Sequence, residues 1–300
     1  MAGSLNAIHT YSDPGLDKQK TFDYELSIRL SADAFVYCIF DSNTGKFLHI
    51  EAFDLSEPGK KIFMPGDREV SDTSKLVQLL EGELQWLPGN FSRIRLILDQ
   101  GKSTLVPEAL FSESEKARIF DFNVAGGPHE AAELMHDHIK SLHAYAIYHI
   151  PASITDLIHK FFPDALIFHH STALIQSLFI KTMNLENDKM LFVNTGKSGV
   201  DILRINAKKL EYFNSFQYNT ADDYMYYLIF VVEQLGLNPE SVEVMMMGEV
   251  DRHSSLSDLV RKYVRNVDFM KRNDDYRYSF VFDQLPGQYY YNLLNASLCE

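Results

Sequence analysis

The sequence has few cysteines and few basic residues. Its two cysteines, Cys38 and Cys299, are too few for a disulfide framework or a cysteine zinc site, so we expect a cytoplasmic protein. Only 28 Lys and Arg stand against 41 Asp and Glu, which gives a net charge of −13. This charge repels phosphate backbones and no basic stretch offsets it, so we expect no nucleic-acid binding.

Long hydrophobic runs are also missing. The longest, residues 224–232, is less than half of the roughly 20 residues that a membrane helix needs, and the first 20 residues have no apolar segment typical of a signal peptide. Composition is otherwise ordinary, with 46% hydrophobic and 23% charged residues. A chain of 300 residues favours one large or two medium domains.

The first half of the chain predicts three strands, a helix and a fourth strand. After a polar tail at residues 1–21, alternating or densely apolar stretches predict strands at 26–30, 35–40 and 47–55. Leucines and a valine at helical spacing predict a helix over 71–87, and 93–99 is a further strand.

The second half repeats this order. Strands are predicted at 190–194, 200–206 and 210–218, then a helix at 220–235 that begins with a Thr220 and Asp223 capping box, then a strand at 242–247. The first two strands of each half coincide at an offset of 165 residues and the third strands at 163. The pattern indicates a β-β-β-α-β unit present twice.

Between the two units we expect a joining region of alternating strands and helices. Strands are predicted at 119–124, 144–150 and 165–169, and helices at 129–142, 151–162 and 171–182; a closing helix is predicted at 288–294. We therefore expect an α/β protein with a first lobe at 22–171 and a second at 172–300, with the C-terminal helix able to return to the first.

This doubled unit resembles the actin-like ATPase superfamily, and the chain is similar to an uncharacterised bacterial family of that fold. The resemblance is carried by three stretches: residues 26–55, 104–111 and 169–248. It implies two RNase H-like halves in two lobes, with a nucleotide-sized cleft between them, and ATP with Mg²⁺ as the ligand.

The residues that hold the nucleotide in that superfamily are altered here. The first hairpin of the superfamily reads Asp-x-Gly, where the carboxylate holds hydrated Mg²⁺, but Arg29 and Ser31 stand at these positions. The corresponding hairpin of the second half has an amide, Asn194, in place of the acid. A Gly-Gly motif on the adenosine side is reduced to Gly248 followed by Glu249. The candidates for a degenerate nucleotide site are Ser31, Asn194, Gly196, Lys197, Ser198 and Gly248.

These changes predict a pseudo-ATPase, a non-hydrolysing binding or scaffold protein without catalytic or metal-binding residues. We expect no cofactor, since the changes disfavour ATP and Mg²⁺, and a protein partner or a small ligand in the cleft. The alternative is a divergent nucleotide-dependent phosphotransferase or ATPase that uses Asp33, Asp99 or Asp201. A third hypothesis is assembly into filaments or into a membrane-linked complex, as in pilus and cell-division relatives.

Two other motifs favour ordinary interpretations. Gly196-Lys197-Ser198 resembles the end of a P-loop, but Leu191 stands where the first glycine is required. Glu133 and His136 have the Glu-x-x-His spacing of a helical metal ligand, but there is no second copy, and His136 and His138 would diverge on a helix. We therefore expect a Gly-rich turn in the first case and solvated or helix-capping histidines in the second.

Overall fold

The chain divides into two compact units. The structure, a computed structural model, describes residues 7–56, 73–99, 101–124, 132–183, 189–197, 199–206 and 209–299. Unit 1 consists of Met1–Ala173, Asp274–Asp283 and Asn295–Glu300, and unit 2 of Leu174–Asn273 and Gln284–Leu294. In the described part of the chain, no helix is long and apolar enough to cross a membrane.

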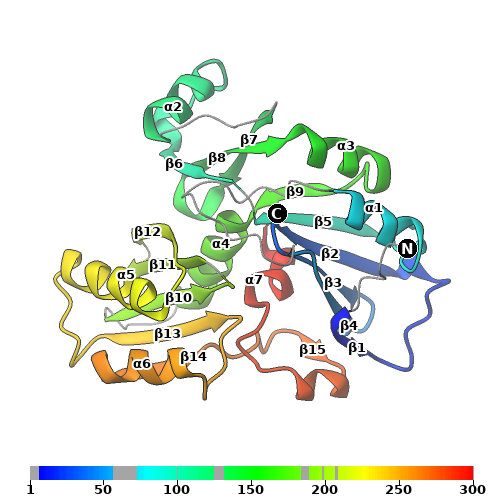
Figure 1. Ribbon diagram of the computed structural model, residues 1–300. Helices are drawn as coiled ribbons and strands as arrows, with labels where there is room; N and C mark the ends of the chain where they lie inside the picture. Colours follow the sequence, from blue (N-terminus) through cyan, green and yellow to red (C-terminus); the bar gives the residue numbers. More distant parts are fainter. Residues whose placement is uncertain are drawn as a thin grey trace. The chain divides into compact units, whose positions relative to one another are not determined.

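The large sheet of unit 1 has the strand order β1-β4-β3-β2-β5-β9 (Figure 1). Its strands are β1 (Ala7–Ser12), β2 (Tyr24–Ser31), β3 (Ala34–Asp41), β4 (Lys46–Asp54), β5 (Arg93–Asp99) and β9 (Leu166–His169), and β15 (Arg277–Tyr278) pairs with β4. β2, β3 and β4 form the predicted antiparallel meander, and β5 is parallel to β2. The segment expected as a polar tail contains β1, which pairs with β4.

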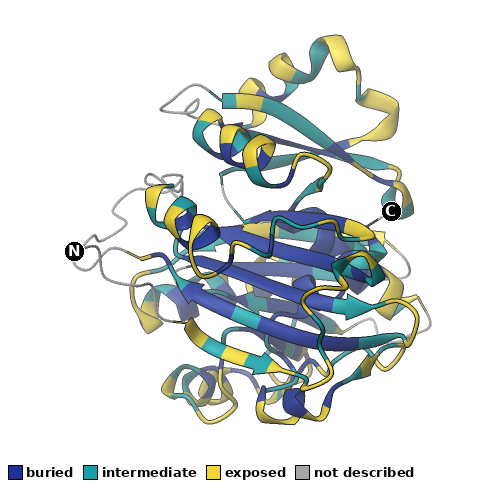
Figure 2. Cartoon of the chain, turned by 90° about the vertical axis from the view of Figure 1, so that its right-hand side faces the viewer, coloured by how far each residue is buried: buried dark blue, intermediate teal, exposed yellow. Residues whose placement is uncertain are grey.

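Two helices, α1 (Ser74–Glu81) and α3 (Ala152–Phe161), supply side chains to the hydrophobic core of this sheet. Leu76 and Leu80 of α1 and Leu157 of α3 join Ile28 and Leu96 from the strands in one buried cluster. Each such side chain contributes roughly 1.5–3 kcal/mol on burial. The burial map in Figure 2 shows the central strands as the most continuously buried part of the chain.

A three-stranded sheet completes unit 1, and here two predictions were wrong. Its strands are β6 (Ser103–Pro107), β7 (Ala132–Ile139) and β8 (Ala144–Pro151), in the order β6-β8-β7. Residues 132–139 were predicted as helix but form β7, and residues 119–124 were predicted as strand but lie in and directly after helix α2 (Lys116–Asn123).

Unit 2 contains a five-stranded sheet with the order β12-β11-β10-β13-β14 (Figure 1). Its elements are β10 (Met190–Thr195), β11 (Gly199–Asn206), β12 (Lys209–Gln217), α5 (Ala221–Gln234), β13 (Glu243–Gly248), α6 (Ser255–Tyr263) and β14 (Asn266–Phe269). Thr220 and Asp223 form the predicted capping box of α5. Apolar residues of α5 and α6, such as Leu228 and Val260, cover Val193 and Met246 of the sheet.

The two units share their strand order. β4-β3-β2-β5-β9 of unit 1 and β12-β11-β10-β13-β14 of unit 2 have the same sequence of antiparallel and parallel pairs. β3 begins at residue 34 and β11 at 199, which is 165 residues later; β4 begins at 46 and β12 at 209, which is 163 later. The duplicated α/β arrangement is therefore present.

The other helices of the described residues are α4 (His170–Thr182), α7 (Tyr291–Leu294) and several short 3-10 helices. Helix α4 follows β9, and the predicted closing helix is limited to α7. The 3-10 helices are Thr21–Asp23, Glu108–Leu110, Glu113–Glu115, Lys140–Leu142, Phe280–Gln284 and Ala296–Leu298.

Candidate functional site

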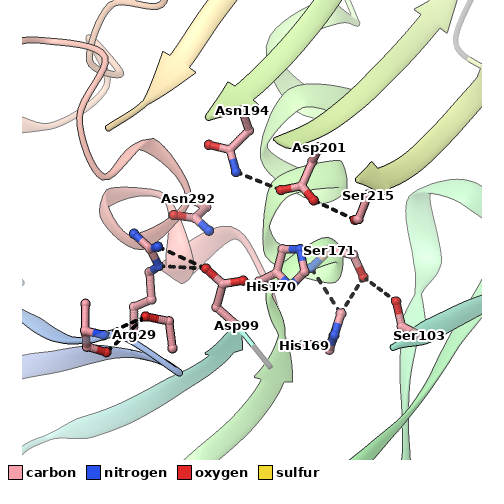
Figure 3. Close-up of polar contacts among 12 residues, drawn as sticks. Arg29, Asp99, Ser103, His169, His170, Ser171, Asn194, Asp201, Ser215 and Asn292 are labelled. Atoms are coloured by element: carbon pink, nitrogen blue, oxygen red, sulfur yellow. Dashed lines mark hydrogen bonds and ion pairs between the residues drawn. The ribbon is translucent and has the colours of Figure 1, made fainter. Parts of the chain in front are cut away.

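A largely buried ion pair lies where β2 and β5 end side by side in unit 1. The parallel register places Ser31 opposite Asp99, two residues beyond Arg29. Nε and Nη2 of Arg29 both lie 3.0 Å from Oδ2 of Asp99 (Figure 3). The Arg29 side chain is 10% exposed and that of Asp99 is 21% exposed. The residue at the expected magnesium position is therefore a cation bound to the carboxylate of the neighbouring strand.

His170 approaches the same carboxylate from the first residue of α4. Its Nδ1 lies 3.4 Å from Oδ1 of Asp99, so one carboxylate oxygen faces the guanidinium and the other faces the imidazole. The guanidinium neutralises the Asp99 carboxylate and repels a divalent cation that approaches it. We name Arg29, Asp99 and His170 the Arg–Asp–His cluster.

Ser31 closes the first hairpin turn. Its hydroxyl donates to Oδ1 of Asp33 at 2.7 Å and accepts the backbone N–H of Ala34 at 2.9 Å. The turn amide at Ala34 is therefore bound within the hairpin. A turn that offers its amides to a phosphate needs these groups directed outward.

A buried network lies beside this cluster, built on Asp137 of β7. Oδ1 of Asp137 accepts from the Tyr148 hydroxyl at 2.8 Å, and Oδ2 accepts from the backbone N–H of His169 at 2.8 Å. Nδ1 of His169 lies 2.7 Å from Oγ of Ser171. Burial raises the pKa of Asp137 to about 6, although these hydrogen bonds act to lower it. The network joins β7 and β8 of the small sheet to the end of β9.

In unit 2 the counterpart of Arg29 is Asn194, and it is also engaged. Its side-chain amide donates to Oδ2 of Asp201 on β11 at 2.9 Å, while Oδ1 of Asp201 accepts from the Ser215 hydroxyl on β12 at 2.6 Å (Figure 3). The three side chains bridge neighbouring strands. Asp201, one of the acids of the alternative hypothesis, is thus buried and paired on both oxygens.

The glycine turn after Asn194 is closed by its own backbone. The N–H of Gly196 donates to the Gly199 carbonyl at 2.7 Å, and the Gly196 carbonyl accepts from the Tyr218 hydroxyl at 2.6 Å. Lys197 lies in this turn, and Ser198 lies outside the described residues. β11 follows the turn where a P-loop requires a helix, as predicted.

Gly248 ends β13 at a close approach of two backbones. Its φ is +88°, and an added Cβ would lie 2.8 Å from the backbone nitrogen of Thr195 and overlap the Thr195 carbonyl. The Gly248 N–H donates to the Gln288 carbonyl at 2.9 Å, and the Glu249 N–H donates to the Thr195 carbonyl at 2.7 Å. The glycine expected against an adenosine therefore has a packing requirement within unit 2.

The ATP and Mg²⁺ that the resemblance implies do not fit these residues. Arg29 cannot bind a cation, Asp99 is bound by Arg29, Asp201 is hydrogen-bonded on both oxygens, and the turn amides of Ala34 and Gly196 are bound internally. Among the described residues, no group of three or more His, Cys, Asp or Glu is placed to hold a metal ion.

The histidines near residue 136 lie on a strand, which corrects the helical interpretation. His136 and His138 both contact Tyr145, with ring centroids 5.6 Å and 4.5 Å apart, so they share a face of the small sheet. Nδ1 of His136 is 3.3 Å from a Glu113 oxygen, and Nε2 of His138 is 3.6 Å from a Glu108 oxygen.

Sequence reasoning located the two hairpins but missed most of their partners. His170 lies in the stretch 169–248 that carries the family resemblance, and Asp137, Tyr148 and Gln288 gave no local signal. Asp137 was hidden because the stretch was interpreted as helix. A strand assignment would have put a carboxylate on the inward face.

Comparison with protein families identifies the family to which this chain belongs. Residues 13–267 match the family described as "Protein of unknown function (DUF3822)". The chain belongs to this family. A search of the curated proteins finds no match.

Solved structures place this DUF3822 protein in the actin-like ATPase fold. A Bacteroides thetaiotaomicron VPI-5482 protein with actin-like ATPase fold and unknown function is 26% identical, with a TM-score of 0.68, 85% of this chain covered and 93% of that one. A PilM-PilN type IV pilus biogenesis complex gives a TM-score of 0.59 at 12% identity, with 92% and 98% covered. The fold expected from the sequence is confirmed.

Proposed function

We propose that this DUF3822 protein is a non-hydrolysing binding or scaffold protein, which keeps the actin-like ATPase fold without its phosphate chemistry. The Arg–Asp–His cluster carries the proposal. In the superfamily that the chain resembles, an acid at the end of this first-hairpin strand holds hydrated Mg²⁺, and here a guanidinium occupies that position, bound to Asp99.

Unit 2 supports the same conclusion independently. Asn194 is a neutral amide that donates to Asp201, and an amide cannot serve as a general base. The acids of the alternative phosphotransferase are all engaged: Asp33 accepts from Ser31, Asp99 lies between Arg29 and His170, and Asp201 accepts from Asn194 and Ser215. A binding role is also in keeping with a neighbour of this fold that is named as a complex, PilM-PilN.

The experiment is calorimetry of the full chain with millimolar Mg-ATP, combined with an assay for released phosphate. We expect neither binding heat nor phosphate above the rate of buffer alone. Replacement of Mg²⁺ by EDTA separates binding of the nucleotide from binding of the metal complex.

Binding followed by phosphate release would contradict the proposal. In that case the Asp33→Asn and Asp201→Asn double variant tests whether these two acids are needed for phosphate release. Loss of phosphate release in this variant, with its circular dichroism spectrum unchanged, would establish the phosphotransferase or ATPase alternative.

A further inference from the structure

The outer edge of the unit 2 sheet carries an uncharged aromatic segment. β12 is the last strand of the order β12-β11-β10-β13-β14, and within the described residues no strand pairs with its outer side. Residues 212–217, Tyr-Phe-Asn-Ser-Phe-Gln, contain three aromatic rings and no charge, proline or glycine. Such six-residue segments have a high tendency to pair with another strand. We name residues 212–217 the β12 edge.

The β12 edge has a defined start. The register with β11 shifts between Arg204 and Ile205, so Glu211 is an extra residue between Leu210 and Tyr212. Glu211 is held by Nε of Arg204 at 2.9 Å and by the side-chain amide of Asn206 at 2.8 Å. The bulge and this acidic residue confine pairing to the segment that follows them.

Other sheet edges in the described residues carry features that discourage pairing. β9 and β14 have four residues each, β6 ends in Pro107, β1 contains an irregularity near His9, and β7 directs the buried Asp137 inward. The β12 edge has none of these from Tyr212 onward.

A row of aromatic rings continues from the β12 edge onto α5. Phe216 stacks on Tyr227 at 4.6 Å between centroids, Tyr227 contacts Tyr226 at 5.4 Å, and Tyr226 stacks on Phe230 at 6.2 Å. Tyr226 is 66% exposed and Phe230 39%. Strand edge and helix therefore offer one continuous aromatic surface, the composition favoured at protein interfaces.

Charge distribution favours this unit as a contact between copies. Unit 2 contains 12 of the 28 Lys and Arg and 13 of the 41 Asp and Glu, so its net charge is −1, which leaves −12 of the total −13 in unit 1. Two copies of a strongly acidic chain approach each other at least electrostatic cost through the nearly neutral part.

We propose that the β12 edge binds the β12 edge of a second copy, in antiparallel pairing about a twofold axis at Asn214. This register places Tyr212 opposite Phe216 of the partner, twice by symmetry, with Asn214 opposite its own copy. No charged residue lies between the strands, and the Tyr226 and Phe230 surfaces of both copies flank them. The proposal is independent of whether ATP is hydrolysed.

The test is the molar mass of the full chain by sedimentation equilibrium across a range of concentrations. We expect a dimer of twice 34.5 kDa for the wild type. Asn214→Lys puts two like charges opposite each other at the axis and should weaken association at least tenfold. Ser255→Lys adds the same charge at an exposed position of α6 and should leave the dimer intact.

Two further measurements guard against misfolding of the lysine variant. Tyr226→Ser changes an exposed residue of the aromatic row and should also weaken the dimer. Hydrogen exchange of the wild type should show amides of residues 212–217 more protected at high than at low protein concentration. Two results would overturn the proposal: a monomeric wild type at the highest concentration, or a dimer that neither Asn214→Lys nor Tyr226→Ser weakens. The β12 edge would then be assigned to pairing with a strand of a different protein.

Discussion

Arg29 shows how one residue determines what the adjacent ends of β2 and β5 can bind. β2 and β5 pair in parallel with Ser31 opposite Asp99, and the long side chain of Arg29, two residues before Ser31, reaches the Asp99 carboxylate. An acid at position 29 would face Asp99 as a second negative charge, which a divalent cation would neutralise. Arg29 supplies the positive charge itself. The guanidinium therefore lies at the carboxylate where the superfamily resemblance implies a cation.

Asp137 gives a prediction about pH. Burial raises its pKa in the folded protein to about 6, against an ordinary value near 3.8. Between these values the folded protein binds a proton that the unfolded chain has lost, so this group lowers stability as pH rises from about 4 to about 6. The full effect is about 3 kcal/mol. In Asp137→Asn this contribution is absent.

The measurement is urea denaturation of both proteins from pH 4 to pH 7. The difference in unfolding free energy, wild type minus Asp137→Asn, should fall with rising pH and level off above about pH 6. Other carboxylates with lowered pKa values make both proteins more stable as pH rises, and this contribution cancels in the difference. Parallel curves for the two proteins would show that Asp137 titrates normally.

At the scale of elements, the close approach of paired strands β13 and β10 at their ends depends on Gly248. We expect Gly248→Ala to lower the unfolding free energy by about 3 kcal/mol, because φ is +88° and the added Cβ meets the Thr195 backbone. Gly236→Ala is the matched control: its φ is +61° but nothing lies within 4 Å of the added Cβ, so only the backbone penalty of about 1–2 kcal/mol applies. Thermal denaturation measures both, and equal losses would contradict the packing argument.

Elements whose periodicity matched their burial could be predicted from the sequence. β3, β4 and β11 alternate or are densely apolar, and α5 has a capping box, so their existence and order followed directly. β7 could not be predicted, because Ala132, Glu133, Leu134 and Met135 are strong helix formers and only pairing with β8 makes them a strand. In α2 the alternation of residues 119–122 suggested a strand, although only Phe120 is buried.

The candidate site was predictable to a similar extent. The repeat offset identified Arg29 and Asn194 as equivalent hairpin positions, because hairpins are local. Partners that are distant in sequence were not accessible. Asp99 lies 70 residues from Arg29, and Gln288 lies 40 residues beyond Gly248, so no spacing rule connects them. These contacts exist only once parallel strands and the C-terminal segment are in place.

At the scale of the whole molecule, the chain returns to unit 1 after most of unit 2 is complete. Residues 274–283 supply β15, which pairs in parallel with β4. Tyr276 packs edge-on against Phe40 and Phe47, each at 5.5 Å, and Tyr278 stacks on Phe47 at 5.3 Å. The stability of unit 1 therefore depends on residues that follow it by about a hundred positions.

Tyr276→Ala tests this dependence. It should lower the stability of unit 1 by about 2–3 kcal/mol through loss of the aromatic contacts. Tyr276→Phe should cost only about 1 kcal/mol, because it removes just the 2.6 Å hydrogen bond with Ser297.

Trp86, the single tryptophan, packs against the core of unit 1, so its fluorescence reports the unfolding of that unit. Tyr263→Ala, at a 57% exposed position of α6, is the control and should leave the transition unchanged. If Tyr276→Ala shifted the Trp86 transition no more than this control, the C-terminal segment would be dispensable for unit 1.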